Sequence, residues 1–136
     1  MNERPLSDRD YRALARFRHA LRVFQRFSED AARAAGVTPA HHQLLLAVRG
    51  WAGPGRPAVA DLAEMLQLRH HSTVELIQRA TAAGLVRATT DPDDQRRQLI
   101  ELTGPGRDVL ASLSLEHRDE LRRFRSEMTA VLDELG

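Results

Sequence analysis

The sequence of 136 residues predicts a mainly helical protein that carries one small β-hairpin. Three observations lead to this fold class. Apolar residues recur at helical spacing near both ends of the chain. Between these ends, glycine and proline divide the chain into shorter helical segments. Only residues 85–102 change to β-type runs, which flank a polar turn.

The composition is that of an ordinary folded protein with a single domain. Hydrophobic residues make up 42% and charged residues 29%, and the net charge of +1 is low for a nucleic-acid binder. The absence of cysteine excludes disulfides and thiolate metal sites. No apolar run approaches the ~18 residues of a membrane span, and the N-terminus does not resemble a signal peptide. We therefore expect a cytoplasmic protein without membrane contact.

Capping signals mark the first two helices. The first, over residues 8–35, follows Ser7, which can cap it, and precedes Gly36, which can end it. Thr38 and Pro39 begin the second helix as a hydroxyl cap followed by proline in the first turn. The glycine- and proline-rich loop that follows must end this second helix.

Two further helices are predicted on either side of a tight corner. The shorter covers residues 61–66, and the longer covers residues 72–83 and ends at Gly84. The corner lies at Leu68 and Arg69. Two helices joined in this way form a compact pair.

The periodicity then changes from helical to β. Residues 85–90 and 98–102 are the two β-type runs, and the polar turn Asp91–Asp94 joins them into a hairpin. Thr103 opens a final helix whose apolar residues are spaced by threes and fours, close to a heptad seam. This seam predicts a dimer built from the terminal helices. Packing of the seam against the first helix of the same chain is the alternative.

The order of elements over residues 38–102 is that of a winged helix-turn-helix. In that arrangement the second helix of the pair enters the major groove of DNA, the first helix braces it, and the hairpin reaches the backbone or the minor groove. The second helix has a polar side on which we expect Thr73, Glu75, Gln78 and Arg79 to face outward. Any amphipathic surface helix shows such a pattern, so this feature alone is weak support.

Three stretches of the sequence resemble regulators of the MarR family. Val59–Leu66 is similar to the family's bracing helix, and Ala82–Val86 to the end of its recognition helix. Asp91–Arg97 and the Leu-Thr-x-x-Gly step at residues 102–106 are similar to its wing and to the start of the following helix. The resemblance spans about residues 37–107.

This resemblance implies a homodimeric transcriptional regulator, in the expected role of repressor, that binds a near-palindromic operator in double-stranded DNA. Residues 37–103 would form the winged helix-turn-helix region. Residues 1–36 and 104–136 would form the helical dimerisation region of one compact domain.

The resemblance also implies where DNA contacts lie. Asp94 and Arg96 match the Asp-x-Arg pattern of the wing, in which the acid orients the tip and the arginine enters the minor groove. Arg79 matches a basic residue late in the recognition helix. The other expected contacts lie in the corner, the recognition helix and the wing: Arg69, His70, His71, Ser72, Thr73, Gln78 and Arg97.

Two positions depart from the family pattern. Gln95 stands where many members have a second basic residue, and Arg97 could replace it. Glu75 stands where a basic or neutral side chain is expected, and a carboxylate there weakens binding unless it accepts from a cytosine amino group. The favoured interpretation is instead a capping box, Ser72-x-x-Glu75, in which Glu75 folds back onto the helix start.

The spacing of the histidines does not indicate a metal site. The six histidines show no His-x-x-x-His spacing, and adjacent histidines point in different directions. His70 and His71 are therefore either exposed corner residues or contacts to DNA phosphate. We expect no metal and no cofactor.

An enzyme is not expected, because the sequence lacks a glycine-rich phosphate loop and a nucleophile elbow. The alternative function is a helical dimerisation module that has lost DNA binding. Glu75 and Gln95 favour this alternative, and Arg79, Arg96 and Arg97 oppose it.

Members of the MarR family often respond to small aromatic anions. By that resemblance, an effector pocket would lie among the first, second and fifth helices, near Phe17, His42 and Trp51. Packing at a helix end is the alternative role for Trp51. The sequence identifies no effector and no operator.

Overall fold

The computed structural model describes residues 3–135. These residues form five helices and one antiparallel hairpin, which confirms the predicted fold class. They divide into two compact units. The first unit combines the residues up to Ala31 with those from Ser114 onward, and the second comprises residues 32–113.

The first unit consists of helix α1 (Asp8–Ala34) as far as Ala31 and the C-terminal part of helix α5 (Gly104–Glu134). The predicted cap at the start of α1 is present. The Ser7 hydroxyl accepts from the Asp10 backbone N–H at 3.3 Å, and the Asp10 carboxylate accepts from the Ser7 backbone N–H at 2.9 Å. These reciprocal bonds satisfy donors that a helix start leaves unpaired.

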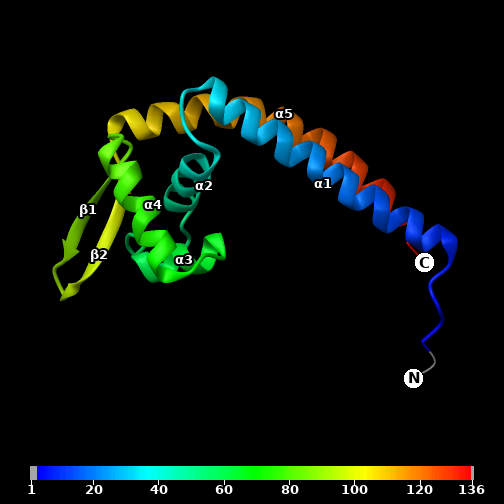
Figure 1. The fold of residues 1–136 in the computed structure, drawn as a ribbon, viewed down its shortest axis with the longest axis horizontal. Helices are drawn as coiled ribbons and strands as arrows, with labels where there is room; N and C mark the ends of the chain where they lie inside the picture. Colours follow the sequence, from blue (N-terminus) through cyan, green and yellow to red (C-terminus); the bar gives the residue numbers. More distant parts are fainter. Residues whose placement is uncertain (1–2, 136) are drawn as a thin grey trace. The chain divides into compact units, whose positions relative to one another are not determined.

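The two helices of the first unit run antiparallel, side by side (Figure 1). The Phe24 and Phe124 rings lie 5.2 Å apart between them. The His117 Nε2 atom lies 2.9 Å from the Ser28 hydroxyl. Nearer the C-terminal end of α5, the Arg16 guanidinium lies 2.7 Å from the Glu134 carboxylate. Several large apolar side chains of these helices remain exposed: Tyr11, Leu14, Val23, Leu115, Leu121 and Leu132.

Helix α2 (Pro39–Arg49) contributes buried residues to the core of the second unit. The Thr38 hydroxyl accepts from the His41 backbone N–H at 3.0 Å, and proline occupies the first turn, so the predicted helix start is confirmed. Leu44 and Leu45 of this helix are fully buried. The other large apolar side chains that are buried in this unit are Leu62, Leu76, Ile77, Val86, Ile100, Leu102, Leu110 and Leu113.

Helices α3 (Val59–Leu66) and α4 (His70–Ala82) form the helix-turn-helix pair. Both begin two residues earlier than predicted. The predicted capping box at Ser72 and Glu75 is wrong, because the Thr73 backbone N–H already donates to the Arg69 carbonyl at 3.0 Å. The backbone is therefore helical from His70, and Ser72 lies inside the first turn.

Strands β1 (Val86–Asp91) and β2 (Asp94–Leu102) form the antiparallel wing. The second strand begins at Asp94 instead of residue 98, which leaves a shorter turn than predicted. The pairing shifts between Thr90 and Asp91, and residues 95–97 of β2 bulge at this point. The bulge places three polar residues at the tip of the hairpin.

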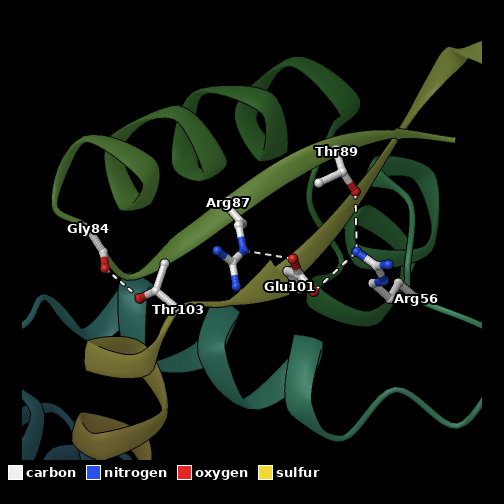
Figure 2. Close-up of polar contacts among 6 residues, drawn as sticks. All are labelled: Arg56, Gly84, Arg87, Thr89, Glu101 and Thr103. Atoms are coloured by element: carbon white, nitrogen blue, oxygen red, sulfur yellow. Dashed lines mark hydrogen bonds and ion pairs between the residues drawn. The ribbon is translucent and has the colours of Figure 1, made fainter.

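Helix α5 starts at a junction that explains the Leu-Thr-x-x-Gly step. The Thr103 hydroxyl donates to the Gly84 carbonyl at 2.5 Å (Figure 2) and accepts from the Gly106 backbone N–H at 3.1 Å. The Thr103 backbone N–H donates to the Leu85 carbonyl at 3.0 Å. This one residue thus joins the end of the wing, the end of α4 and the start of α5.

Among the described residues, no helix has the length and apolar character that a membrane span requires.

Candidate nucleic-acid interface

Helix α4 presents a polar face away from the core. Its buried residues are Thr73, Leu76, Ile77 and Ala80. With 3.6 residues per turn, the positions opposite this buried face are His71, Glu75, Gln78 and Ala82, and all four are exposed. The sequence therefore predicted the outward direction of Glu75 and Gln78 correctly.

The outward direction predicted for Thr73 is wrong. Its side chain is 0% exposed, and its hydroxyl donates to the Arg69 carbonyl at 2.9 Å. Because α4 begins at His70, Thr73 falls on the face that packs into the core, where its hydroxyl needs a backbone acceptor. Thr73 supports the helix-turn-helix pair from inside.

Glu75 and Arg79 form an exposed pair on α4. The Glu75 carboxylate lies 3.6 Å from the Arg79 guanidinium, one helical turn away. Their side chains are 60% and 71% exposed, so neither is held by the core. Arg79 also lies near His41 of α2. Burial, and secondly the positive charge of Arg79, lower the pKa of the His41 imidazole below its ordinary value of 6.5.

A hollow of about 670 Å³ lies between α4 and the wing. Its wall is largely apolar, with Val74 and Ile77 of α4 opposite Ala88 and Ile100 of the hairpin. Five residues predicted to contact DNA also line it: His70, Gln78, Asp94, Arg96 and Arg97. Folding thus brings residues from α4 and from the wing tip to one concave surface.

The tip of the wing is ordered by its own carboxylates. The Asp94 carboxylate accepts from the Arg96 backbone N–H at 3.0 Å and lies 3.7 Å from the Arg96 guanidinium. The Asp91 carboxylate accepts from the Asp93 backbone N–H at 2.9 Å. The Arg96 side chain is 96% exposed, so its guanidinium is presented to solvent at the tip of a braced turn.

Arg97 has different surroundings from Arg96. Its guanidinium lies 3.3 Å from the Asp61 carboxylate of α3, and its side chain is 49% exposed. The same Asp61 carboxylate accepts from the Ala58 backbone N–H at 2.8 Å. Asp61 was not among the predicted site residues, although an acid in the first turn of a helix is a capping signal. It holds the wing to the bracing helix.

The corner between α3 and α4 carries Arg69, a further predicted residue, beside His70. Arg69 and His70 line a shallow hollow of about 470 Å³ together with Gln67 of the corner. His71 is exposed and Ser72 is half-buried. Arg69, His70 and His71 are therefore open to solvent beside the polar face of α4.

The base of the wing is held by a second cluster that the sequence did not reveal (Figure 2). The Glu101 carboxylate of β2 lies 2.7 Å from the Arg87 guanidinium of β1 and 3.1 Å from that of Arg56, in the loop before α3. The Arg56 guanidinium also donates to the Thr89 hydroxyl at 3.3 Å. These contacts tie the loop to the outer face of the hairpin.

The three residues predicted to contact an effector belong to different parts of the chain. Phe17 lies on α1 in the first unit, whereas His42 and Trp51 belong to the second unit, where His42 is buried. Trp51 lines a hollow of about 530 Å³ together with three arginines: Arg49, Arg56 and Arg107. Among the described residues, no group of three or more His, Asp or Glu side chains is arranged to hold a metal ion.

Comparisons with known proteins agree with this architecture. Residues 35–97 match the model of the MarR family. AbsC, a MarR family transcriptional regulator of Streptomyces coelicolor, has a similar structure, with a TM-score of 0.75 and 23% identity over 90% of this chain and 82% of that chain. No match was found among curated protein sequences.

Two further structures are similar. A mutant of E. coli MarR in complex with operator DNA gives a TM-score of 0.70 at 19% identity, over 87% of this chain and 86% of that chain. BpsR of Bordetella bronchiseptica, whose DNA binding is regulated by 6-hydroxynicotinic acid, gives 0.66 at 20% identity over the same shares. Residues 35–97 of this chain therefore resemble the MarR family, and the solved structures show that the chain has the same fold.

Proposed function

We propose that this protein is a homodimeric, sequence-specific regulator of transcription that binds double-stranded DNA and acts as a repressor. One observation supports this most directly. The exposed polar face of α4 and the fully exposed Arg96 of the wing lie in one unit with a MarR-type fold. In a winged helix-turn-helix, these two parts are the ones that reach the major groove and the adjacent backbone or minor groove.

The proposed DNA contacts come from the corner, the exposed face of α4 and the wing. Arg69, His70 and His71 would contact phosphate or base edges at the corner. Gln78 and Arg79 would face the major groove, and Arg96 would enter the minor groove. A regulator of this kind acts on the chromosome, so we place it in the cytoplasm.

Dimerisation would come from the first unit. Its two helices expose apolar side chains along their length. A single exposed apolar residue is common on protein surfaces, but a row of them favours an interface with another protein. A two-fold dimer would present two α4 helices to successive major grooves, about one helical turn apart, over a near-palindromic operator.

The decisive experiment is selection of bound duplexes from a random pool, followed by a salt titration on the selected sequence. We expect a near-palindromic consensus and an affinity that falls steeply as salt increases, because released counterions contribute much of the binding free energy. Selection of no consensus, with equally weak binding to all duplexes, would instead favour a dimerisation module that has lost DNA binding.

Release by a small aromatic or anionic effector is the second part of the proposal. The hollow beside Trp51 favours it, because this hollow combines an aromatic ring with the guanidinium groups of Arg49, Arg56 and Arg107. The Trp51 indole N–H is buried and has no hydrogen-bond partner among the described residues. Benzoate, as an aromatic carboxylate probe, should raise the melting temperature of the wild-type protein and change the Trp51 fluorescence. No change in either signal up to millimolar benzoate would argue against this site.

A further inference from the structure

Glu75 lies on the exposed face of α4, which is the face proposed to enter the major groove. We propose that Glu75 is a specificity-determining residue: its carboxylate accepts a hydrogen bond from the amino group of a cytosine in the major groove. Arg79 donates to a guanine of the same or the next base pair. This inference rests on the proposed function, because it requires α4 to enter the groove.

The geometry of α4 places Glu75 where a base edge would lie. The buried face of the helix is formed by Thr73, Leu76, Ile77 and Ala80, and Glu75 lies on the opposite side. Its side chain is 60% exposed, and it does not cap the helix, because α4 begins at His70 with Arg69 in the capping position. The carboxylate is therefore free of the backbone and projects from the outward face.

The chemistry of the major groove selects cytosine as the partner of this carboxylate. An ionised carboxylate only accepts hydrogen bonds. Guanine and thymine present acceptors in the major groove, so both repel it. Adenine presents an amino donor beside the N7 acceptor, whereas cytosine presents an amino donor alone. Cytosine is thus the base whose major-groove edge suits Glu75 best.

Arg79 makes the arrangement electrostatically acceptable. Its guanidinium lies 3.6 Å from the Glu75 carboxylate, so a positive charge accompanies the negative charge as α4 approaches the DNA phosphates. Arginine is also the side chain that most often reads guanine, through the O6 and N7 acceptors. The pair together would read a cytosine and a guanine in each half of the operator.

The test compares operators selected by the wild-type protein with those selected by Glu75→Gln and Glu75→Ala. We expect the wild-type consensus to hold one cytosine per half-site whose replacement by thymine weakens binding about ten-fold. The same replacement should weaken binding of Glu75→Ala less than about two-fold. Glu75→Gln should shift the preference at that position towards adenine, because an amide can bind the N6 and N7 groups of adenine together.

A matched control removes the same charge from the bracing helix. Glu64→Gln should change affinity equally for all operators and leave the base preference as in the wild type. An unchanged consensus in both Glu75 variants, with higher affinity at every sequence, would overturn the inference and make Glu75 a purely electrostatic residue. Equal weak binding of all duplexes by the wild type would instead refute the proposed function itself. Circular dichroism melting of each variant shows that the fold is retained.

Discussion

Arg96 and Arg97 are neighbours in the chain, but their guanidinium groups have different surroundings. Arg96 is almost fully exposed at the wing tip, and its guanidinium lies 3.7 Å from the Asp94 carboxylate. Arg97 is half-exposed and lies 3.3 Å from Asp61 of α3. The first arginine is available to a DNA partner, whereas the second already contributes to holding the wing in place.

Replacement of Arg96 by alanine should weaken operator binding by about 1–3 kcal/mol, because a minor-groove or phosphate contact is lost. The oligomeric state and the melting temperature should remain unchanged, since the side chain is 96% exposed. Fluorescence anisotropy with a labelled operator measures the affinity. If the affinity of Arg96→Ala equals that of the wild type, the wing has no part in DNA binding.

Replacement of Asp61 by alanine should lower the free energy of unfolding by about 1 kcal/mol, chiefly through loss of the acceptor for the Ala58 backbone N–H. The partly exposed ion pair with Arg97 should contribute less. Asp61→Asn keeps an acceptor oxygen and should retain most of the stability in urea unfolding. If both variants lose the same free energy of unfolding, the charge of Asp61 and not its capping hydrogen bond stabilises the fold.

His41 predicts a dependence of stability on pH. Burial, and then Arg79, lower the pKa of its imidazole in the folded protein, so the unfolded chain binds a proton more readily. The free energy of unfolding should therefore fall as the pH decreases through 6.5 and continue to fall until the folded-state pKa is passed. In His41→Gln the fall between pH 7 and pH 5 should be smaller. An identical pH profile in both proteins would contradict this origin.

At the scale of elements, the junction that starts α5 constrains the wing most tightly. Thr103 bonds to residues at the end of α4, and Gly106 passes close to the backbone of Leu85. A Cβ atom at Gly106 would clash with the Leu85 carbonyl oxygen. The final glycine of the Leu-Thr-x-x-Gly step is therefore required because any larger side chain would clash with the Leu85 backbone.

Gly106→Ala should lower the free energy of unfolding by about 1–3 kcal/mol, because the backbone of Leu85 must move to admit the methyl group. Gly104→Ala is the matched control two residues earlier, where a Cβ would meet no atom of the described residues within 4 Å. Urea unfolding of the two variants compares them directly. Equal stability of both would mean that the junction adapts without strain.

At the scale of the whole molecule, the first unit leaves several large apolar side chains exposed to solvent. Leu121 and Leu132 of α5 are 48% and 67% exposed, and Val23 of α1 is 48% exposed. Two paired helices alone bury little apolar area, so these exposed side chains are where the proposed dimer would bury its interface.

Leu121→Glu together with Leu132→Glu should shift the protein from dimer to monomer, because two charges would be buried at the proposed interface. Light scattering coupled to size-exclusion chromatography measures the mass. Leu46→Glu is the control, since Leu46 is equally exposed at 48% but lies on α2 in the second unit. Monomers in the wild type, or dimers in the double variant, would place dimerisation elsewhere.

Local sequence is sufficient for much of this molecule. The starts of α1 and α2 follow from Ser7 and Thr38, because a cap needs only groups a few residues away. The family resemblance in the wing likewise led to Asp94 and Arg96, whose contact in the turn is local. Short-range bonds of this kind can be recognised from spacing alone.

Other features depend on the folded core. Thr73 is buried and Glu75 projects outward because packing against α2, α3 and the wing decides which face of α4 turns inward and where the helix begins. The Arg97–Asp61 pair joins residues 36 positions apart. No spacing rule predicts such a pair, because the two groups meet only after the hydrophobic core has brought the wing against α3.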